Sequence, residues 1–546
     1  MTERSPALPV PESMEPIFAS VPVTALLKGE RRLEGEAYLS GGYAIRLRIE
    51  ASGVPSTKIA EVADVWQPSR LKGITVSSEQ GVPFFTATQV FDVQPVVRKW
   101  IAPKQTENLE KRYVEPGWIL VTCSGNVGEV IISHTPHRSV VLSHDILRVQ
   151  ARNEAALGYL YCFLRSQFGR AMLQSSKYGS IIKHLEPEHV NEVPLPLIPD
   201  GLKLRLNERV DRIYEMRDVA YSLTVQAQER FGKEIGVAPK WKAEDEKAFT
   251  VRAKDCFGRA RRIDGYHYNP RARAVLAALR NTGRPMESLR SLVEAIVLPN
   301  RFVRTPASGG LPYVDSEDIF KVNPAVTKFI AAKQDLRPYF VKRRWILLCR
   351  SGQIYGICGS VMMADRRHEE KVFSEDLIRI IPKAGGVRPG YLQMVLGHQI
   401  YGRPLVLRLA FGTQIPHIAP GDLHDFPVIR FGEGVENEIA DQMEKAVTLR
   451  ADAAEEENRI VAEVEAYLEE MLHPGERVVH EAVMESPESP PPGPEAITLS
   501  RYPLTSKPAL SASLKVDSER ARAAEKREGP MRKSLRERRK NSKGSR

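Results

Sequence analysis

The stretch Trp118-Ile-Leu-Val-Thr-Cys-Ser-Gly125 returns later in the chain as Trp345-Ile-Leu-Leu-Cys-Arg-Ser-Gly352. In both places a run of apolar residues ends at Ser-Gly, which predicts a strand followed by a turn. Five more motif pairs recur in the same order: Arg31–Tyr38 with Arg261–Tyr268, Gly81–Phe85 with Gly310–Val314, Ser143–Arg148 with Ser374–Arg379, Gly158–Leu160 with Gly390–Leu392, and Tyr178–His184 with Phe411–His417. The separation along the chain is nearly the same for all six pairs, and this constant spacing predicts an internal duplication.

The composition is that of an ordinary soluble protein. Of 546 residues, 42% are hydrophobic and 27% are charged. No apolar run approaches the roughly 18 residues that a membrane span needs, and the first residues lack the pattern of a secretory signal. Five scattered cysteines form no Cys-x-x-Cys pair, so the sequence predicts neither a zinc site nor a disulfide framework. We therefore expect a cytoplasmic protein with no membrane partner.

The positive charge is unevenly distributed. The net charge is +11, but residues 515–546 hold 13 Lys/Arg and 5 Asp/Glu and supply +8 of it. The rest of the chain is only mildly basic, so the overall charge is a weak indication of nucleic-acid binding. The leader 1–30 is Pro- and Ser-rich, and residues 474–546 are Pro-rich and then basic. We expect a flexible leader and a disordered basic tail.

Two long helices are predicted, over 200–232 and 432–473. Asp200 is the predicted N-cap and Gly232 the predicted C′ residue of the first. Each has one apolar seam with gaps of three and four residues: Leu206, Val210, Ile213 and Leu223 in the first, and Ile439, Met443, Ile460 and Val464 in the second. Each helix could pack its apolar seam against its own domain. The alternative that we favour is an antiparallel coiled-coil spacer, with about 45 Å for a 30-residue helix.

The remaining segments predict an α+β fold in each copy. Short β-rich runs bounded by Gly, Pro, Asn and Ser alternate with a few helices. We expect a first domain over 31–199, a charged connector over 233–260 and a second domain over 261–431. The predicted fold class is therefore two tandem, similar mixed domains, each followed by a long helix.

Motifs for catalysis are weak. His184-Leu-Glu-Pro-Glu-His189 has the wrong spacing for a zinc motif, and Pro187 would interrupt the helix that such motifs need. Phe431-Gly-Glu-Gly434 has some likeness to the Gly-rich turn of S-adenosylmethionine enzymes, but a helix start explains it better. Asp200 with Asp245-Glu-Lys247 makes a poor nuclease pattern, and no phosphate-binding P-loop occurs. We expect no catalytic centre and no metal or cofactor site in this chain.

Binding is the remaining class of function. Phosphate contacts need Lys and Arg, and base edges are read by Arg, Lys, Asn and Gln. The candidate DNA-contacting residues are Arg70, Lys72, Arg98, Lys99, Lys104, Arg112, Asn126 and Lys183 in the first copy, and Arg301, Arg304, Arg337, Arg343, Arg344, Arg350, Gln353, Tyr355 and Gln414 in the second.

Together these motifs resemble the specificity (S) subunit of type I restriction–modification systems. The resemblance rests on the repeated Arg-x-Asp/Glu-x-x-x-Tyr element, the Gly-x-Pro-aromatic segment, the Ser-Gly strand-turn, the Gly-Tyr-Leu helix, the Gly-Ser/Thr turn and a Pro-containing strand before each long helix. It covers about 31–232 and 261–472. The leader, the connector and the tail are extra to the family pattern.

The resemblance implies two target recognition domains that each bind half of a split site in double-stranded DNA. It also implies a non-catalytic subunit that joins two adenine-specific methyltransferase subunits and, in full complexes, ATP-dependent restriction subunits. S-adenosylmethionine, ATP and Mg would then belong to those partners. Two alternatives stay open: a standalone nucleic-acid-binding or scaffold protein derived from such a system, and a restriction or modification enzyme with an unrecognised catalytic centre.

Overall fold

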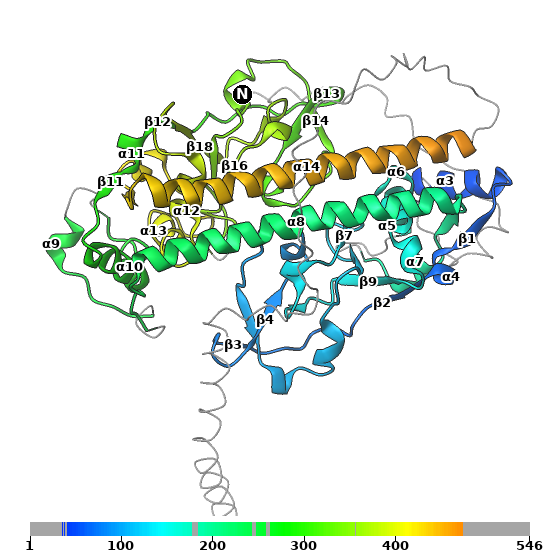
Figure 1. Ribbon diagram of the computed structural model, residues 1–546, viewed down its shortest axis with the longest axis horizontal. Helices are drawn as coiled ribbons and strands as arrows, with labels where there is room; N and C mark the ends of the chain where they lie inside the picture. Colours follow the sequence, from blue (N-terminus) through cyan, green and yellow to red (C-terminus); the bar gives the residue numbers. More distant parts are fainter. Residues whose placement is uncertain are drawn as a thin grey trace, which may run out of the picture.

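The computed structural model describes residues 35 and 38 and the ranges 41–176, 184–242, 247–257, 262–354 and 356–472. The predicted leader and tail lie outside these residues, as do the candidates Lys183 and Tyr355. The described chain is a mixed α and β structure, as predicted from the sequence. It comprises two α/β units, over 41–199 (the first unit) and 262–432 (the second unit), on two long helices (Figure 1). No helix in these ranges is both long and apolar enough to cross a membrane.

The first unit contains three sheets. Their strand orders are β1-β10, β2-β9-β6-β7 and β3-β5-β4-β8, and all pairs are antiparallel except β4 with β8. The strands are β1 (Ser56–Lys58), β2 (Ala63–Trp66), β3 (Thr75–Val76), β4 (Val82–Phe85), β5 (Lys99–Ile101), β6 (Ile119–Thr122), β7 (Val130–Ile132), β8 (Val141–Leu142), β9 (Ile146–Ala151) and β10 (Pro194–Pro196). The helices are α3 (Gly41–Ala51), α4 (Ile59–Val62), α5 (Leu157–Arg165), α6 (Gln167–Ser176) and α7 (Pro187–Asn191).

The second unit has a similar succession of pairings, in which the one long strand β13 pairs with β14 where β3 and β4 both pair with β5 in the first unit. Its strand orders are β11-β19, β12-β18-β15-β16 and β14-β13-β17, and here β13 with β17 is the parallel pair. The strands are β11 (Met286–Ser288), β12 (Val293–Val297), β13 (Pro306–Val314), β14 (Lys328–Ile330), β15 (Ile346–Cys349), β16 (Val361–Met363), β17 (Val372–Phe373), β18 (Leu377–Pro382) and β19 (Pro427–Ile429). The helices are α10 (Pro270–Asn281), α11 (Leu289–Leu292), α12 (Pro389–Gly397) and α13 (Arg403–Leu407).

The long helices are α8 (Asp200–Ile235) and α14 (Glu433–Leu472). The predicted ends of the first need correction. Pro199 is the N-cap, and the helix continues past Gly232 to Gly236, whose φ of 67° and N–H bond to the Gly232 carbonyl close it. Gly236 can adopt this left-handed conformation without strain, so it is the C-terminal stop. The described part of the connector holds one short helix, α9 (Ala253–Cys256).

The helices α8 and α14 lie side by side and run antiparallel (Figure 1). Arg209 near the start of α8 pairs with Glu456 at 2.6 Å, whereas Arg230 near its end pairs with Glu438 at 3.0 Å. Seven of the eight predicted seam residues are buried: Leu206, Val210, Ile213, Ile439, Met443, Ile460 and Val464. Leu223 is only half-buried, because the neighbouring Thr224 occupies the buried position instead. A role for this pair as a coiled-coil spacer stays a prediction.

The units pack at opposite ends of the helix pair. The core of the first unit includes the apolar face of α8 from Leu202 to Tyr214 and that of α14 from Ala453 to Leu472. The core of the second includes the apolar face of α8 from Ala227 to Ile235 and that of α14 from Ile439 to Met443. Each unit therefore packs one face against both helices, and the cores formed in this way are separate.

Candidate nucleic-acid interface

The β3-β5-β4-β8 sheet of the first unit and the β14-β13-β17 sheet of the second, here called the small sheets, each carry a lysine and an aromatic residue at the same register. Lys99 of β5 lies opposite Phe84, and Lys328 of β14 lies opposite Tyr313. The next residues are Trp100 and Phe329, which both face a proline on the neighbouring strand. Both lysines are exposed, although Lys328 is ion-paired with Asp315, and Phe329 is 41% exposed. A cation beside a flat aromatic surface suits contact with the phosphates and bases of nucleic acid.

Two candidate arginines also occupy matched places. Arg70 lies four residues after the end of β2, and Arg301 lies four residues after the end of β12. Both are exposed, as are Lys72 and Lys104. Arg98 is half-buried, and its guanidinium lies 4.0 Å from the Asp92 carboxylate. Exposed candidates thus surround the small sheet of the first unit.

The second unit has a hollow of about 690 Å³ beside β13 and β14, with Arg304 and Phe329 in its wall. The Arg304 guanidinium carbon lies 5.3 Å from the ring centre of Phe302 and 5.4 Å from that of Tyr313. Arg304 also forms an ion pair with Glu375. Burial lowers the pKa of Arg304, but Glu375 and Tyr313 together outweigh this and raise the pKa overall. Arg304 therefore stays protonated at neutral pH, and two aromatic rings and the Glu375 carboxylate hold its guanidinium at the hollow.

Three predicted contact residues are placed differently from what we expected. Arg112 is only 2% exposed and donates to Ser69 Oγ at 3.3 Å, so its side chain is buried within the fold and not on the surface as we expected. Arg344 donates to both carboxylate oxygens of Glu444 on α14, at 2.9 and 3.2 Å. Arg350 is half-buried, 3.9 Å from Asp376. The last two are committed to contacts within the fold.

The other polar candidates of the second unit are at the surface. Gln353 and Gln414 come together, with Gln353 Nε2 donating to the Gln414 carbonyl at 3.5 Å. Arg337 and Arg343 are exposed, and Arg337 donates to the Asp335 carboxylate at 2.9 and 2.8 Å. In the first unit, the exposed Asn126 donates to Glu129 at 3.4 Å. A contact of any of these side chains with DNA stays a prediction.

Two buried arginines escaped the prediction from the sequence. Arg148 and Arg379 are 0% and 1% exposed, and each donates to three carbonyls of its own unit that lie at matched places. Burial lowers the pKa of both to about 10, which still leaves them charged at neutral pH. The sequence contains an indication of this shared role, because both arginines end the recurring Ser-x-Asp-x-x-Arg motif. Arg148 fixes the turn that precedes β9, and Arg379 fixes the turn that precedes β18.

The units also touch each other directly. The Val93 N–H donates to the Phe320 carbonyl and the Val322 N–H donates to the Phe91 carbonyl, both at 2.8 Å. Asp92 and Lys321 form an antiparallel bridge between these bonds. Burial raises the pKa of Asp92 to about 7. This short pairing fixes the position of one unit relative to the other.

A buried charge cluster joins the helices to both units. The Glu457 carboxylate of α14 accepts from Arg217 of α8 at 3.0 and 2.9 Å and from Asn323 of the second unit at 2.6 Å. It also accepts from Tyr161 and lies 3.3 Å from Arg165 of the first unit. Burial alone would raise the pKa of Glu457, but the two arginines outweigh it and hold the pKa at about 2.

Within the described ranges, no group of three or more His, Cys, Asp or Glu side chains is placed to hold a metal ion. His189 is buried, and its Nδ1 accepts the Glu186 N–H at 2.9 Å at the start of α7. It therefore caps a short helix whose first residue is Pro187. The segment Phe431–Gly434 leads into α14, as expected of a helix start.

The chain is similar to solved type I S subunits. The S subunit of M. genitalium is 11% identical, and the match covers 77% of this chain and 96% of that chain with a TM-score of 0.28. The HsdS subunit of Thermoanaerobacter tengcongensis is 14% identical, with coverage of 77% and 96% and a TM-score of 0.23. No family model matches the chain. No curated protein matches it either.

Proposed function

We propose that this chain is the DNA-sequence-specifying subunit of a type I restriction–modification complex and has no catalytic centre of its own. The two units are then tandem target recognition domains that arose by duplication, and each contacts one half of a bipartite DNA site. The observation that carries this proposal is the recurrence of one set of strand pairings at opposite ends of the α8–α14 pair. Two similar binding units on one helix pair can bind two DNA segments at the same time.

The helix pair suits the role of a spacer. Its helices have 36 and 40 residues, which corresponds to about 54 and 60 Å of length. Besides the helices, the paired segments at Asp92 and Lys321 hold the units together. A fixed geometry between the two contact surfaces favours target halves that are a constant number of base pairs apart.

The two halves of the target are different sequences in this proposal. The units share their strand pairings, but the side chains around the small sheets differ. Lys72 of the first unit is matched by Val303 in the second, and Asn126 is matched by Gln353. Different side chains on like supports read different base edges, so the site is asymmetric.

The partners in this proposal are double-stranded DNA, two adenine-specific methyltransferase subunits and ATP-dependent restriction subunits. The catalytic chemistry resides in these subunits, as do S-adenosylmethionine, ATP and Mg. This part of the proposal comes from the family resemblance of the sequence motifs.

Selection of bound duplexes from a random DNA library tests the proposal, with the full chain alone and with a co-purified adenine methyltransferase. We expect two short, unlike consensus stretches separated by a constant gap, and binding that weakens steeply with salt. A continuous or palindromic consensus would contradict the two-unit assignment. Cleavage or methylation of DNA by the purified chain alone would show that it is an enzyme.

A further inference from the structure

Two arginines make corresponding contacts between α8 and α14. The number of residues from Arg217 of α8 to Arg450 of α14 equals the number from Thr224 of α8 to Glu457 of α14. Each arginine reaches across to the other helix. Arg217 donates to Glu457, whereas Arg450 Nη2 donates to Thr224 Oγ1 at 2.8 Å. The same cross-helix contact is thus made twice, once with a carboxylate and once with a hydroxyl.

At Arg217 the acceptor is a carboxylate, that of Glu457. Glu457 is fully buried, and its negative charge faces the two arginines Arg217 and Arg165. Tyr161 and Asn323 donate further hydrogen bonds to the same carboxylate. Every one of these donors therefore points at a single anionic group.

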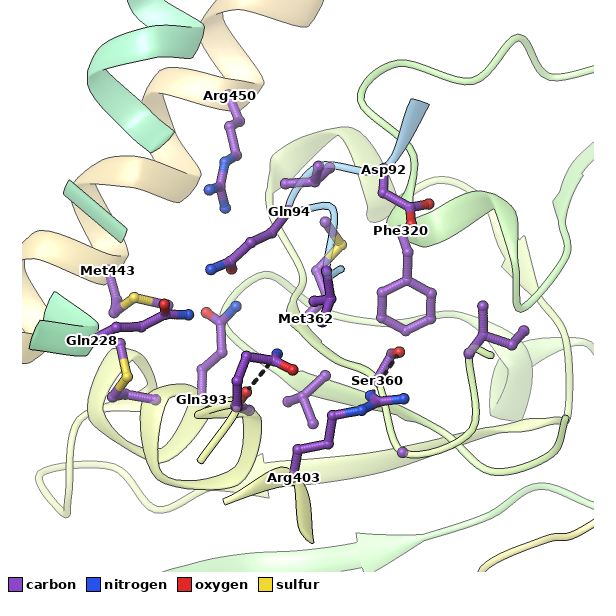
Figure 2. Close-up of a pocket in the computed structure, with 18 of the residues that line it drawn as sticks. Asp92, Gln94, Gln228, Phe320, Ser360, Met362, Gln393, Arg403, Met443 and Arg450 are labelled. Atoms are coloured by element: carbon purple, nitrogen blue, oxygen red, sulfur yellow. Dashed lines mark hydrogen bonds between the residues drawn. The ribbon is translucent and has the colours of Figure 1, made fainter. Parts of the chain in front are cut away.

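Around Arg450 the carboxylate is missing and a cavity of about 90 Å³ lies beside it (Figure 2). Gln393 occupies the place of Tyr161, since both are the third residue after the glycine of the Gly-Tyr-Leu motif. Gln94 occupies the place of Asn323, because both follow the paired cross-unit segments. The cavity wall combines side chains of both units and both helices: Gln94, Arg98, Gln228, Gln393, Arg403 and Arg450.

The cavity has an excess of positive charge. Arg403 donates to Ser360 Oγ and to the carbonyls of Gly356 and Cys358, all neutral acceptors. Arg98 lies 4.0 Å from Asp92, which is the acidic residue in the cavity wall. Burial lowers the pKa of Arg403 and of Arg450 to about 10, so both still carry their charges at neutral pH. The wall thus holds three guanidinium groups and one carboxylate, and that carboxylate lies beside Arg98.

The amides in the wall can complete a site for an anion. Gln393 is 7% exposed, and its Oε1 has no hydrogen-bond partner within the described structure. In Figure 2 its amide lies between Arg450 and Arg403, near Gln94. Rotation of this amide by half a turn presents its N–H groups to the cavity at little cost. Donors from Gln393 and Arg450 would then converge, as donors converge on Glu457 in the other half.

We propose that this cavity binds a small oxyanion, such as phosphate, sulfate or a carboxylate, in place of the carboxylate that Glu457 supplies in the matching site. The volume accommodates an ion of this size, and a bound anion neutralises a charge that the fold otherwise leaves uncompensated. The ion contacts the two units and α14 at once. Its binding therefore strengthens the junction between the two halves of the protein.

The matching site supplies the decisive variant. In Thr224→Glu, a carboxylate reaches Arg450 from the same place from which Glu457 reaches Arg217. Thr224→Gln is the control, with the same size and no charge. Titration calorimetry of the full chain with inorganic phosphate should give one site in the wild type. We expect Thr224→Gln to retain it and Thr224→Glu to weaken it at least about tenfold.

A second variant and a second measurement keep the test independent of folding. Gln94→Ala shortens a cavity donor, and it should also weaken phosphate binding. Phosphate at constant ionic strength should raise the melting temperature of the wild type but not that of Thr224→Glu. The proposal is overturned if the wild type binds no phosphate at one defined site. It is also overturned if Thr224→Glu binds as tightly as the wild type or, should that variant not fold, if Gln94→Ala does.

Discussion

Arg217 of α8 and Glu457 of α14 form a two-bond ion pair in the interior, with nitrogen–oxygen distances of 3.0 and 2.9 Å. The Arg217 guanidinium also lies 4.9 Å from the ring centre of Tyr214. Exposed ion pairs add little to stability, whereas removal of one partner of a buried pair leaves a charge without compensation. The helix packing is therefore expected to be sensitive to substitution of either partner.

Glu457→Gln should destabilise the protein by about 3–5 kcal/mol, because Arg217 and Arg165 then lose their shared counter-charge. Urea unfolding followed by circular dichroism measures this change. Glu463→Gln is the control, since Glu463 pairs with Arg209 but is 42% exposed. We expect that control to cost less than about 1 kcal/mol. Equal destabilisation of the two variants would contradict a special role for the buried pair.

The sequence predicts the helix pair better than it predicts this charge cluster. Gaps of three and four between Leu206, Val210 and Ile213 identify a buried face without knowledge of the partner. Arg217 and Glu457 interrupt that pattern, and a charged residue in a helix normally indicates a solvent-facing position. Their pairing depends on contacts across 240 residues, which periodicity does not contain.

Gly158→Ala and Gly390→Ala should loosen the attachment of each unit to the helices. A Cβ on Gly158 would lie 2.5 Å from the Asn207 backbone of α8, and one on Gly390 would lie 2.6 Å from the Ala440 carbonyl oxygen of α14. We expect each variant to lose about 1–3 kcal/mol in denaturant unfolding, because backbone atoms have to move apart. Gly201→Ala is the control, since no atom lies within 4 Å of its added Cβ. It should be neutral or stabilise α8 by up to about 1 kcal/mol.

Acid should destabilise the first unit through His137. Burial lowers the pKa of His137 to about 3, and its Nε2 lies 2.8 Å from the Val90 carbonyl oxygen. The folded state therefore keeps this group neutral, whereas the unfolded chain binds a proton near pH 6.5. Stability from this group is complete above pH 6.5 and is lost as the pH falls from 6.5 towards 3, by up to about 1.4 kcal/mol for each pH unit.

His137→Gln isolates that contribution. Glutamine can accept at the helix start and donate to Val90, but it does not titrate. The unfolding free energy of the variant should fall less steeply than that of the wild type between pH 6.5 and 4. The raised pKa of Asp92 acts in the opposite direction in both proteins, since it adds stability as the pH falls from about 7. Parallel curves for variant and wild type would contradict the assignment.

The candidate interface illustrates a second limit of the sequence. Arg112 and Lys99 are equally basic residues of the first copy, yet Arg112 is buried and Lys99 is exposed. Composition and motif spacing do not distinguish them, because Lys99 lies in β5 and Arg112 ends a short 3-10 helix, and exposure depends on what packs against each element. By contrast, the matched register of Lys99 and Lys328 follows from the recurrence of their flanking strands.

This matched register leads to a prediction about sequence preference, which rests on the proposed DNA-specifying function. Lys99→Gln should relax the consensus in one half of the target, and Lys328→Gln should relax it in the other half, with a cost of about 1–3 kcal/mol for each base pair that is no longer read. Library selection with each variant measures both halves at once. Arg252→Gln, in the exposed connector, should leave both halves unchanged. If Lys99→Gln and Lys328→Gln relax the same half, the two units do not read separate parts of the target.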